Sequence, residues 1–366
     1  MPLMIEGGRI PPRWAEKKNL RAEGADNCDA PVDCLRVALV NNVPDPALED
    51  TEMQFFELLD TASGEVPVSV KLYSLPELPR GQRGREHLGN FYSGFDELKT
   101  SQFDGVIITG TGPKRLDLRN EPYWGSLIDL LEWAEHNTAS TVLSCLAAHA
   151  SVLHSEGIPR CPLRDKQFGV FAAVKVCEHP LTRGIARLVR FPHSRWNEVR
   201  ADALADCGYV VLTQSPEAGV DLFVKQKQKS LFVHFQGHPE YGDLTLMKEY
   251  CRDIRRFLNH ERETYPSMPH EYFDTEGAKL LNEFRETAEA HRNEELMAVF
   301  PEAAVADTLQ NTWHSSARRV YCNWVQYLAA RQAESSVFSA TASRFRGNGR
   351  CRERGRVVQY ARCGAL

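Results

Sequence analysis

The sequence contains no apolar run that approaches the 18 residues needed to cross a membrane, and its first residues lack the apolar core of a secretory signal. Neither charge is in large excess, because 44 basic and 49 acidic residues leave a net charge of −5. Such a balance gives no global attraction to nucleic acid or to an anionic membrane. We therefore expect a cytoplasmic protein that binds neither.

Paired metal-ligand or redox motifs are also missing. The ten cysteines are scattered through the chain without a CxxC pair, so disulfides are not expected. The one HxxxH pair, His234 and His238, falls along a predicted strand, where side chains four residues apart lie too far from each other to share a zinc ion. The sequence thus predicts no metal site and no bound cofactor.

What the sequence does contain is enough apolar material for a large core: 42% of its 366 residues are hydrophobic and 25% are charged. Short β-branched runs alternate with longer periodic segments, which is typical of an α/β fold. Four runs are apolar almost throughout, as expected for parallel strands that helices cover on both faces: 35–40, 68–73, 104–110 and 140–145. We expect a doubly wound, mostly parallel sheet with helices on both faces.

The domain organisation follows from shifts in composition. Residues 1–34 are polar and aperiodic and are predicted to be an N-terminal extension, and 35–330 form the main domain, with a charged helical insertion near 274–310. The segment 331–366 carries seven arginines from Arg344 onward, and is predicted to be a disordered tail rather than a binding arm.

Cys145 is the first candidate catalytic residue. It stands where a buried strand ends and a helix begins near Leu146, so its sulfur is expected at the carboxyl edge of the sheet, where the helix N-terminus stabilises a thiolate. The backbone N–H of Leu146 is then placed to donate to an oxyanion. A buried, unreactive cysteine is the alternative interpretation.

His238 and Glu240 form the second candidate element, since they follow another predicted strand and stand two residues apart. A carboxylate in that position can hold the imidazole in one tautomer while the other ring nitrogen faces a nucleophile. A surface turn with two solvated side chains would explain the same spacing. Both elements lie at strand ends of one α/β sheet, where ligands bind, which favours the joint interpretation.

Taken together, the motifs resemble the homoserine O-acyltransferase family of the homoserine O-succinyltransferase type, whose catalytic domain is similar to class I glutamine amidotransferases, with a flavodoxin-like sheet. Eight matches occur in order: TExQF at 51–55, FDGVIITG at 103–110, Tyr123 with Trp124, the Cys145 turn, GIP at 157–159, PHSR at 192–195, GHPEY at 237–241, and NW at 323–324.

The resemblance implies a role for each matched position. Cys145 would be the acyl-accepting nucleophile, His238 the general base and Glu240 the residue that orients it. Lys166, Ser194 and Arg252 would contact the substrate, with Arg252 a candidate for pairing with an α-carboxylate. The implied substrates are L-homoserine and an acyl-CoA, in methionine biosynthesis, and the implied assembly is a homodimer.

The chain also departs from the family pattern. Where relatives have a GAP turn, it has Gly110-Thr111-Gly112-Pro113-Lys114-Arg115, which places Lys114 at the position that helps to set acyl choice. A cation there favours succinyl-CoA over acetyl-CoA. Pro46-Ala47-Leu48 replaces a proline followed by two lysines, Gln236 replaces a threonine, and Leu146 replaces an aromatic residue. Amide hydrolysis of the glutamine amidotransferase type, or transfer to another hydroxy-amino acid, remains an alternative function.

Overall fold

The computed structural model describes residues 3–7, 9–20 and 34–347, with side chains through Ser335. Within these residues, ten strands form one sheet in the order β1-β3-β2-β4-β5-β10-β9-β8-β6-β7. The neighbours from β1 to β10 pair in parallel, and those from β10 to β7 pair antiparallel. The strands are β1 (Leu3–Ile5), β2 (Leu35–Val40), β3 (Val68–Tyr73), β4 (Gly105–Ile108), β5 (Ser140–Ser144), β6 (Cys161–Lys175), β7 (Leu188–Glu198), β8 (Val210–Ser215), β9 (Gly219–Lys227) and β10 (Ser230–Phe235).

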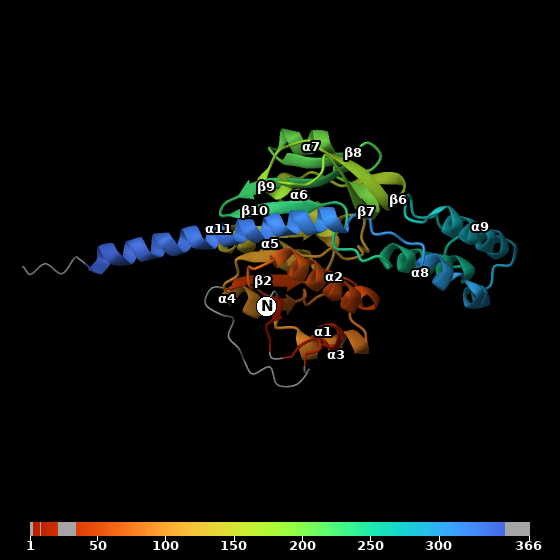
Figure 1. The fold of residues 1–366 in the computed structure, drawn as a ribbon, viewed down its shortest axis with the longest axis horizontal. Coiled ribbons are helices and arrows are strands. Elements are labelled where there is room, and N and C mark those ends of the chain that lie inside the picture. The colour runs from red at the N-terminus through yellow and green to blue at the C-terminus, as the bar shows by residue number, and fades with distance from the viewer. Residues whose placement is uncertain (1–2, 8, 21–33, 348–366) are drawn as a thin grey trace, which may run out of the picture.

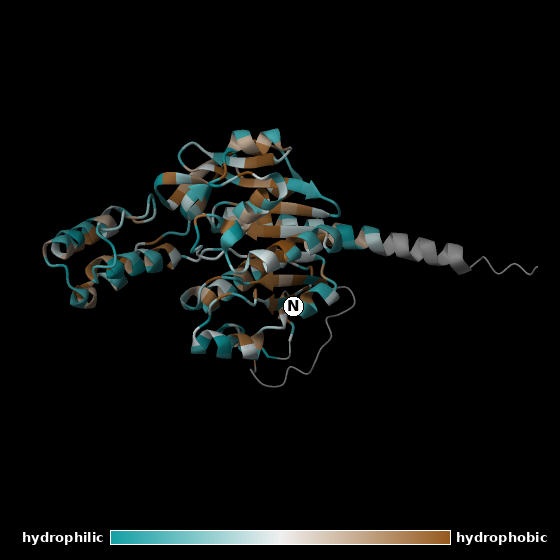
Figure 2. Cartoon of the chain, turned by 180° about the vertical axis from the view of Figure 1, so that it is seen from behind, coloured by the Kyte–Doolittle hydropathy of each residue, from teal (hydrophilic) through white to brown (hydrophobic). Residues whose placement is uncertain are grey.

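Helices cover both faces of this sheet, as Figure 1 shows. Figure 2 shows hydrophobic residues concentrated in the central strands. The helices are α1 (Pro12–Lys18), α2 (Asp45–Ser63), α3 (Gln82–Phe91), α4 (Phe95–Thr100), α5 (Trp124–Asn137), α6 (Leu146–Glu156), α7 (Ala201–Asp206), α8 (Thr245–Leu258), α9 (Thr275–Ala290), α10 (Glu302–Ala306) and α11 (His314–Gly347), with short 3₁₀ turns at Leu118–Asn120, Pro180–Thr182 and Glu294–Val299. The predicted α/β class and the four predicted parallel strands are confirmed.

Successive side chains of β2 point to opposite faces of the sheet, so this one strand contributes to two hydrophobic clusters. Leu35, Val37 and Leu39 pack with α2 and α11 on one face, whereas Ala38 and Val40 pack with α5 and α6 on the other. Because both faces are buried, the strand reads as a continuous apolar run. Among the described residues, no helix is long and apolar enough to span a bilayer.

The segment before residue 34 differs from the predicted extension, because its described part belongs to the fold. β1 adds a parallel edge strand to β3, and Glu6 pairs with Arg36 of β2. Trp14 of α1 is 1% exposed and packs on Phe56 of α2. A strand of three residues is too short to show a period, so the polar composition concealed it.

The C-terminal segment also differs from the prediction at its start. α11 runs without interruption past residue 331, where the tail was expected to begin, to Gly347 (Figure 1). Its first turns hold it on the sheet, because the Trp324 indole donates to Ser140 Oγ at 2.9 Å and Asn323 donates to two backbone carbonyls near residue 182. The rest of the Arg-rich tail, 348–366, lies outside the described residues. The predicted insertion is helical, and α9 and α10 pack with α8 in a separate hydrophobic cluster.

Candidate active site

Cys145 lies in a strained turn between β5 and α6. Its φ of 51° and ψ of −109° place a non-glycine residue in a region of backbone space that L-residues rarely occupy. Such strain is typical of a nucleophile elbow, in which the side chain is pushed out at the sheet edge. The Cys145 N–H donates to the Phe235 carbonyl at 2.8 Å, so the elbow is tied to the end of β10.

The backbone after β4 passes close to this elbow. A Cβ on Gly110 would lie 2.9 Å from the Leu146 nitrogen, so a side chain larger than hydrogen cannot be accommodated there without a shift. Leu146 is the first residue of α6, and N–H groups in a first helical turn have no partner within the helix. The Leu146 N–H is therefore available beside Cys145 as an oxyanion donor.

His238 and Glu240 come from the turn that follows β10, the parallel neighbour of β5. The His238 Nδ1 and Glu240 Oε1 atoms are 2.8 Å apart, and Cys145 lies close enough to His238 to contribute to the rise in its pKa. Ser144 Oγ donates to the same Glu240 oxygen at 3.0 Å. The three predicted residues thus form a connected Cys–His–Glu arrangement at the carboxyl ends of adjacent strands.

The electrostatics of this arrangement favour a charged imidazole. Burial by itself lowers the pKa of His238, but the interactions with Glu240 and then with Cys145 outweigh it and raise the pKa well above its ordinary value. An imidazolium next to a thiolate is the pairing that makes a cysteine nucleophilic near neutral pH.

Beneath the triad lies a buried polar network from the PHSR segment. Arg195 is 3% exposed and donates to His193 Nδ1 at 3.3 Å and to the Asn197 carbonyl at 2.8 Å. His193 Nε2 lies 3.4 Å from Asp221 Oδ1, and Asp221 accepts from the Gly237 N–H at 3.2 Å. Burial raises the pKa of Asp221 to about 6. This network fixes the backbone that presents His238.

The other predicted site residues converge on one carboxylate that the sequence interpretation did not single out. Lys166 of β6, Ser194 of β7 and Arg252 of α8 all donate to Glu249 Oε2, at 3.5 Å for the lysine and the arginine. Lys166 also contacts Asp253 at 3.3 Å. Burial raises the pKa of Glu249, but the charge of Lys166 and the hydrogen bonds from Ser194 and Tyr241 outweigh it, so the net shift is downward.

Tyr241 connects this cluster to the triad. Its ring stacks on His238 with centroids 4.2 Å apart and planes 17° apart, and its hydroxyl donates to Glu249 Oε1 at 2.7 Å. Tyr241 lies in the GHPEY match and Glu249 stands three residues before Arg252, but an acid on a helix otherwise gives no sign of burial. We call Lys166, Ser194, Tyr241, Glu249 and Arg252 the Glu249 cluster.

Lys114 lies apart from these residues, in the exposed loop after Gly110. The backbone N–H groups of Lys114 and Arg115 both donate to the buried Glu121 carboxylate, which fixes the loop. Arg160 donates to the Arg115 and Leu116 carbonyls at 3.4 and 3.3 Å, and its charge acts on Cys145. The loop therefore borders the nucleophile on the side that carries Gly110.

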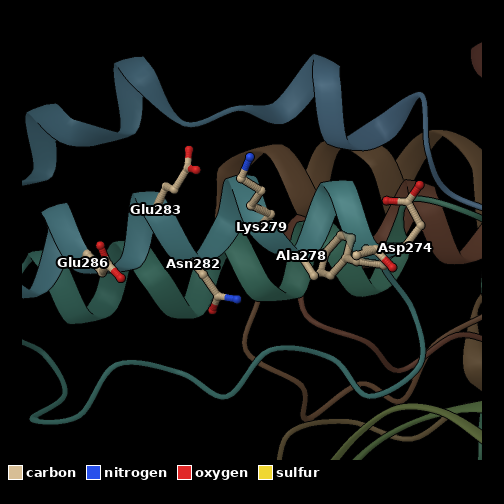
Figure 3. A pocket seen from close by; sticks show the side chains of 8 residues that line it. Asp274, Ala278, Lys279, Asn282, Glu283 and Glu286 are labelled. Carbon is tan, nitrogen blue, oxygen red and sulfur yellow. The ribbon is translucent and has the colours of Figure 1, made fainter.

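An open hollow of about 630 Å³ lies elsewhere, along α9 (Figure 3). Its lining residues include none of the triad or of the Glu249 cluster: Phe273, Asp274, Thr275, Ala278, Lys279, Asn282, Glu283 and Glu286. In the part of the chain that the structure describes, no three His, Cys, Asp or Glu side chains are grouped to hold a metal ion.

Fold and site together define an α/β protein with a cysteine at a nucleophile elbow and a histidine–glutamate pair beside it. The chain belongs to the homoserine O-succinyltransferase family, whose model matches residues 16–335. It is therefore a member of an acyltransferase family of amino-acid biosynthesis.

Curated relatives agree with this placement. The chain is 42% identical to homoserine O-succinyltransferase from Rhodopseudomonas palustris over 296 residues, which is 81% of this chain and 89% of the relative. It is 41% identical to the protein of that name from Bradyrhizobium japonicum over 330 residues, 90% of this chain and 99% of the relative. Among solved structures, the fold is similar to that of a glutamine amidotransferase from Thermotoga maritima, with a TM-score of 0.44 and 12% sequence identity. The match covers 81% of this chain and 98% of that protein's chain.

Proposed function

We propose that this protein transfers a succinyl group from succinyl-CoA to the hydroxyl of L-homoserine through an acyl-enzyme on Cys145, as a step of methionine biosynthesis. The observation that carries the proposal is the continuity of the site: Tyr241 joins the Cys145–His238–Glu240 triad to the Glu249 cluster. Family membership supplies the reaction class, and the relatives are named for the same transfer.

The first half-reaction uses the charged pair. The Cys145 thiolate attacks the thioester carbonyl, a new C–Sγ bond forms, and the Leu146 N–H stabilises the oxyanion. The C–S bond to CoA then breaks, and His238 gives its proton to the departing thiolate. Because the nucleophile and the leaving group are both sulfurs, the exchange is close to balanced in leaving ability.

The second half-reaction needs His238 as a base, and the acyl-enzyme provides that change. In the free enzyme two negative charges, those of Glu240 and the Cys145 thiolate, raise the pKa of His238. Acylation removes the thiolate charge, so the pKa of His238 falls and the ring can accept the proton of the acceptor hydroxyl. The hydroxyl oxygen attacks the acyl carbon, the C–Sγ bond breaks and the thiolate is restored.

The Glu249 cluster offers the two charges that a hydroxy-amino acid requires. Glu249 can pair with the α-ammonium group and Arg252, whose side chain is 57% exposed, with the α-carboxylate. Lys166 and Ser194 keep the Glu249 carboxylate oriented, since both donate to its Oε2 atom. Tyr241 contacts both His238 and Glu249, so an acceptor held by Glu249 presents its hydroxyl toward the base.

The homodimer that the family resemblance implies remains a prediction.

A direct assay tests the transfer. Purified enzyme with succinyl-CoA and L-homoserine is expected to release free CoA and form O-succinylhomoserine, and CoA release is expected to depend on homoserine. Ammonia release from glutamine is measured in parallel. Ammonia production without acyl transfer would replace the proposal with amide hydrolysis, although Leu143 and Ala147 flank the elbow where a glutaminase favours glycine.

Lys114 is proposed to favour succinyl over acetyl donors. The terminal carboxylate of succinyl-CoA needs a partner if it leaves water, and a charge-assisted contact contributes about 1.5 to 3 kcal/mol. We expect Lys114→Ala to lower kcat/KM for succinyl-CoA by about tenfold to more than a hundredfold while changing kcat/KM for acetyl-CoA little.

The matched control is Lys229→Ala, since Lys229 is an exposed lysine in the turn before β10, at the opposite end of that strand from His238. It is expected to leave both donors unaffected. Equal losses with the two donors in Lys114→Ala would instead assign Lys114 to the phosphates of CoA.

A further inference from the structure

The triad carboxylate uses only one of its two oxygens in the structure. Glu240 Oε1 accepts from His238 and from Ser144, whereas Glu240 Oε2 is buried and has no hydrogen-bond partner among the described residues. The side chain is only 4% exposed, so bulk water does not reach this second oxygen. A charged oxygen without a partner in such a place costs several times what a hydrogen bond contributes.

A second buried polar atom without a partner lies on the element that crosses this region. Tyr321 of α11 is 1% exposed, and its hydroxyl has no hydrogen-bond partner in the part of the chain that the structure describes. Its ring stacks on Phe235, the last residue of β10, with centroids 6.1 Å apart and planes 16° apart. Phe235 stands three residues before His238, so the stack places Tyr321 beside the strand end that leads into the triad turn.

The charge of Glu240 reaches Tyr321. Burial first, and the Glu240 carboxylate second, raise the pKa of Tyr321 well above its ordinary value. The hydroxyl therefore keeps its proton throughout the working range and can act as a donor. α11 is held in place here, because Trp324 bonds to Ser140 of β5 and packs edge-on against the Tyr321 ring.

We propose that Tyr321 is a positioning residue of the triad, whose hydroxyl donates to the free Glu240 oxygen across one bound water. A water between two buried polar groups is nearly as favourable as a direct hydrogen bond and satisfies both atoms at once. This inference rests on the proposed function in that it takes Cys145, His238 and Glu240 as the catalytic groups.

The contact has a chemical consequence. A hydrogen-bond donor on Oε2 stabilises part of the Glu240 negative charge that would otherwise act on His238 alone. It therefore limits how far Glu240 raises the pKa of His238. That limit matters in the second half-reaction, in which His238 must be a free base. Tyr321 thus keeps Glu240 from holding the proton too tightly after Cys145 is acylated.

Other groups also interact electrostatically with His238 and Cys145, and they stay unchanged when Tyr321 is altered. His238 interacts with Cys145 at the elbow, His193 of β7 and Asp221 of β9, and the ring of Tyr241 stacks on it. Cys145 also interacts with Arg195 and Arg160. A comparison of two variants that share all of these groups isolates the tyrosine hydroxyl.

Tyr321→Phe removes the hydroxyl and keeps the ring that stacks on Phe235. The primary readout is alkylation of Cys145 by iodoacetamide between pH 5 and 9, measured on the Cys145 peptide by mass spectrometry, because it needs neither CoA nor homoserine. In the plot of alkylation rate against pH, we expect the acidic limb to move to lower pH. On that limb alkylation should be about two- to fivefold faster than in wild type, because a more tightly held imidazolium stabilises the thiolate. Turnover is expected to fall near neutral pH and to recover as pH rises.

The control is Tyr209→Phe. Tyr209 has another buried hydroxyl without a partner in the described ranges, but its ring packs against Phe223 and His234 instead of the triad. It is expected to keep the wild-type alkylation profile. An unmoved limb in Tyr321→Phe, or a uniform slowing at every pH with a lower melting temperature, would overturn the proposal and leave Tyr321 a packing residue. Failure of the homoserine assay alone would bear on the acceptor and not on Tyr321.

Discussion

Replacing Cys145 by serine is expected to abolish acyl transfer and the covalent intermediate together. Intact-protein mass spectrometry after incubation with succinyl-CoA should show one succinyl adduct on the wild type and none on Cys145→Ser. Steady-state turnover should fall on the order of 10³-fold or more, because a serine hydroxyl stays protonated where the thiolate is paired with His238.

The control for this prediction is Cys322→Ser, since Cys322 is a partly buried free cysteine on α11 and is not in the triad. It should retain both the adduct and the activity. An adduct of the same mass that persists in Cys145→Ser would place the acyl group on another side chain and contradict the elbow assignment.

The sheet and the elbow could be predicted from the sequence because their signals are local. Each central strand is a short apolar run, and Cys145 stands directly between such a run and a helix. His238 and Glu240 follow a strand in the same way, and β10 pairs with β5, so two local signals meet at one edge.

The Glu249 cluster shows what local patterns cannot reveal. Glu249 stands between Lys248 and Tyr250 on α8, as a surface acid could, and its side chain is only 15% exposed because Lys166, Ser194 and Tyr241 arrive from three other segments. Those segments lie between 8 and 83 residues away in the chain. The role of Glu249 therefore depends on tertiary packing, which a single sequence does not record.

Tyr321 is harder still to find from sequence, since it is one aromatic residue on an amphipathic helix. Its importance comes from where α11 crosses the sheet, and that crossing is fixed by Asn323 and Trp324, which formed the NW match. The motif was informative about family, and in the structure its two residues dock α11 on the sheet. TExQF also makes a contact between elements, because Gln54 donates to Thr245 at the start of α8.

Removing His238 should be the most informative test of the division of labour in the triad. His238→Ala loses the proton donor of the first half-reaction and the base of the second, so we expect kcat/KM to fall by about 10²- to 10⁴-fold. Glu240→Gln should be less damaging at neutral pH, because the amide can still accept from the ring while the charge that raises the pKa of His238 is gone.

The pH dependence separates these two roles. With Glu240→Gln the pKa of His238 is expected to fall, so the imidazolium loses its proton at lower pH than in wild type. Acylation of Cys145 is then expected to slow above that pH. Deacylation by homoserine is expected to become effective at lower pH than in wild type. Rapid-quench measurement of acyl-enzyme formation and decay resolves the two steps. His154→Ala, on α6 but paired with Glu132, serves as the matched histidine control. Near-normal turnover in His238→Ala would show that another group moves the proton, and external imidazole that restores activity to the alanine variant would identify the missing ring as the base.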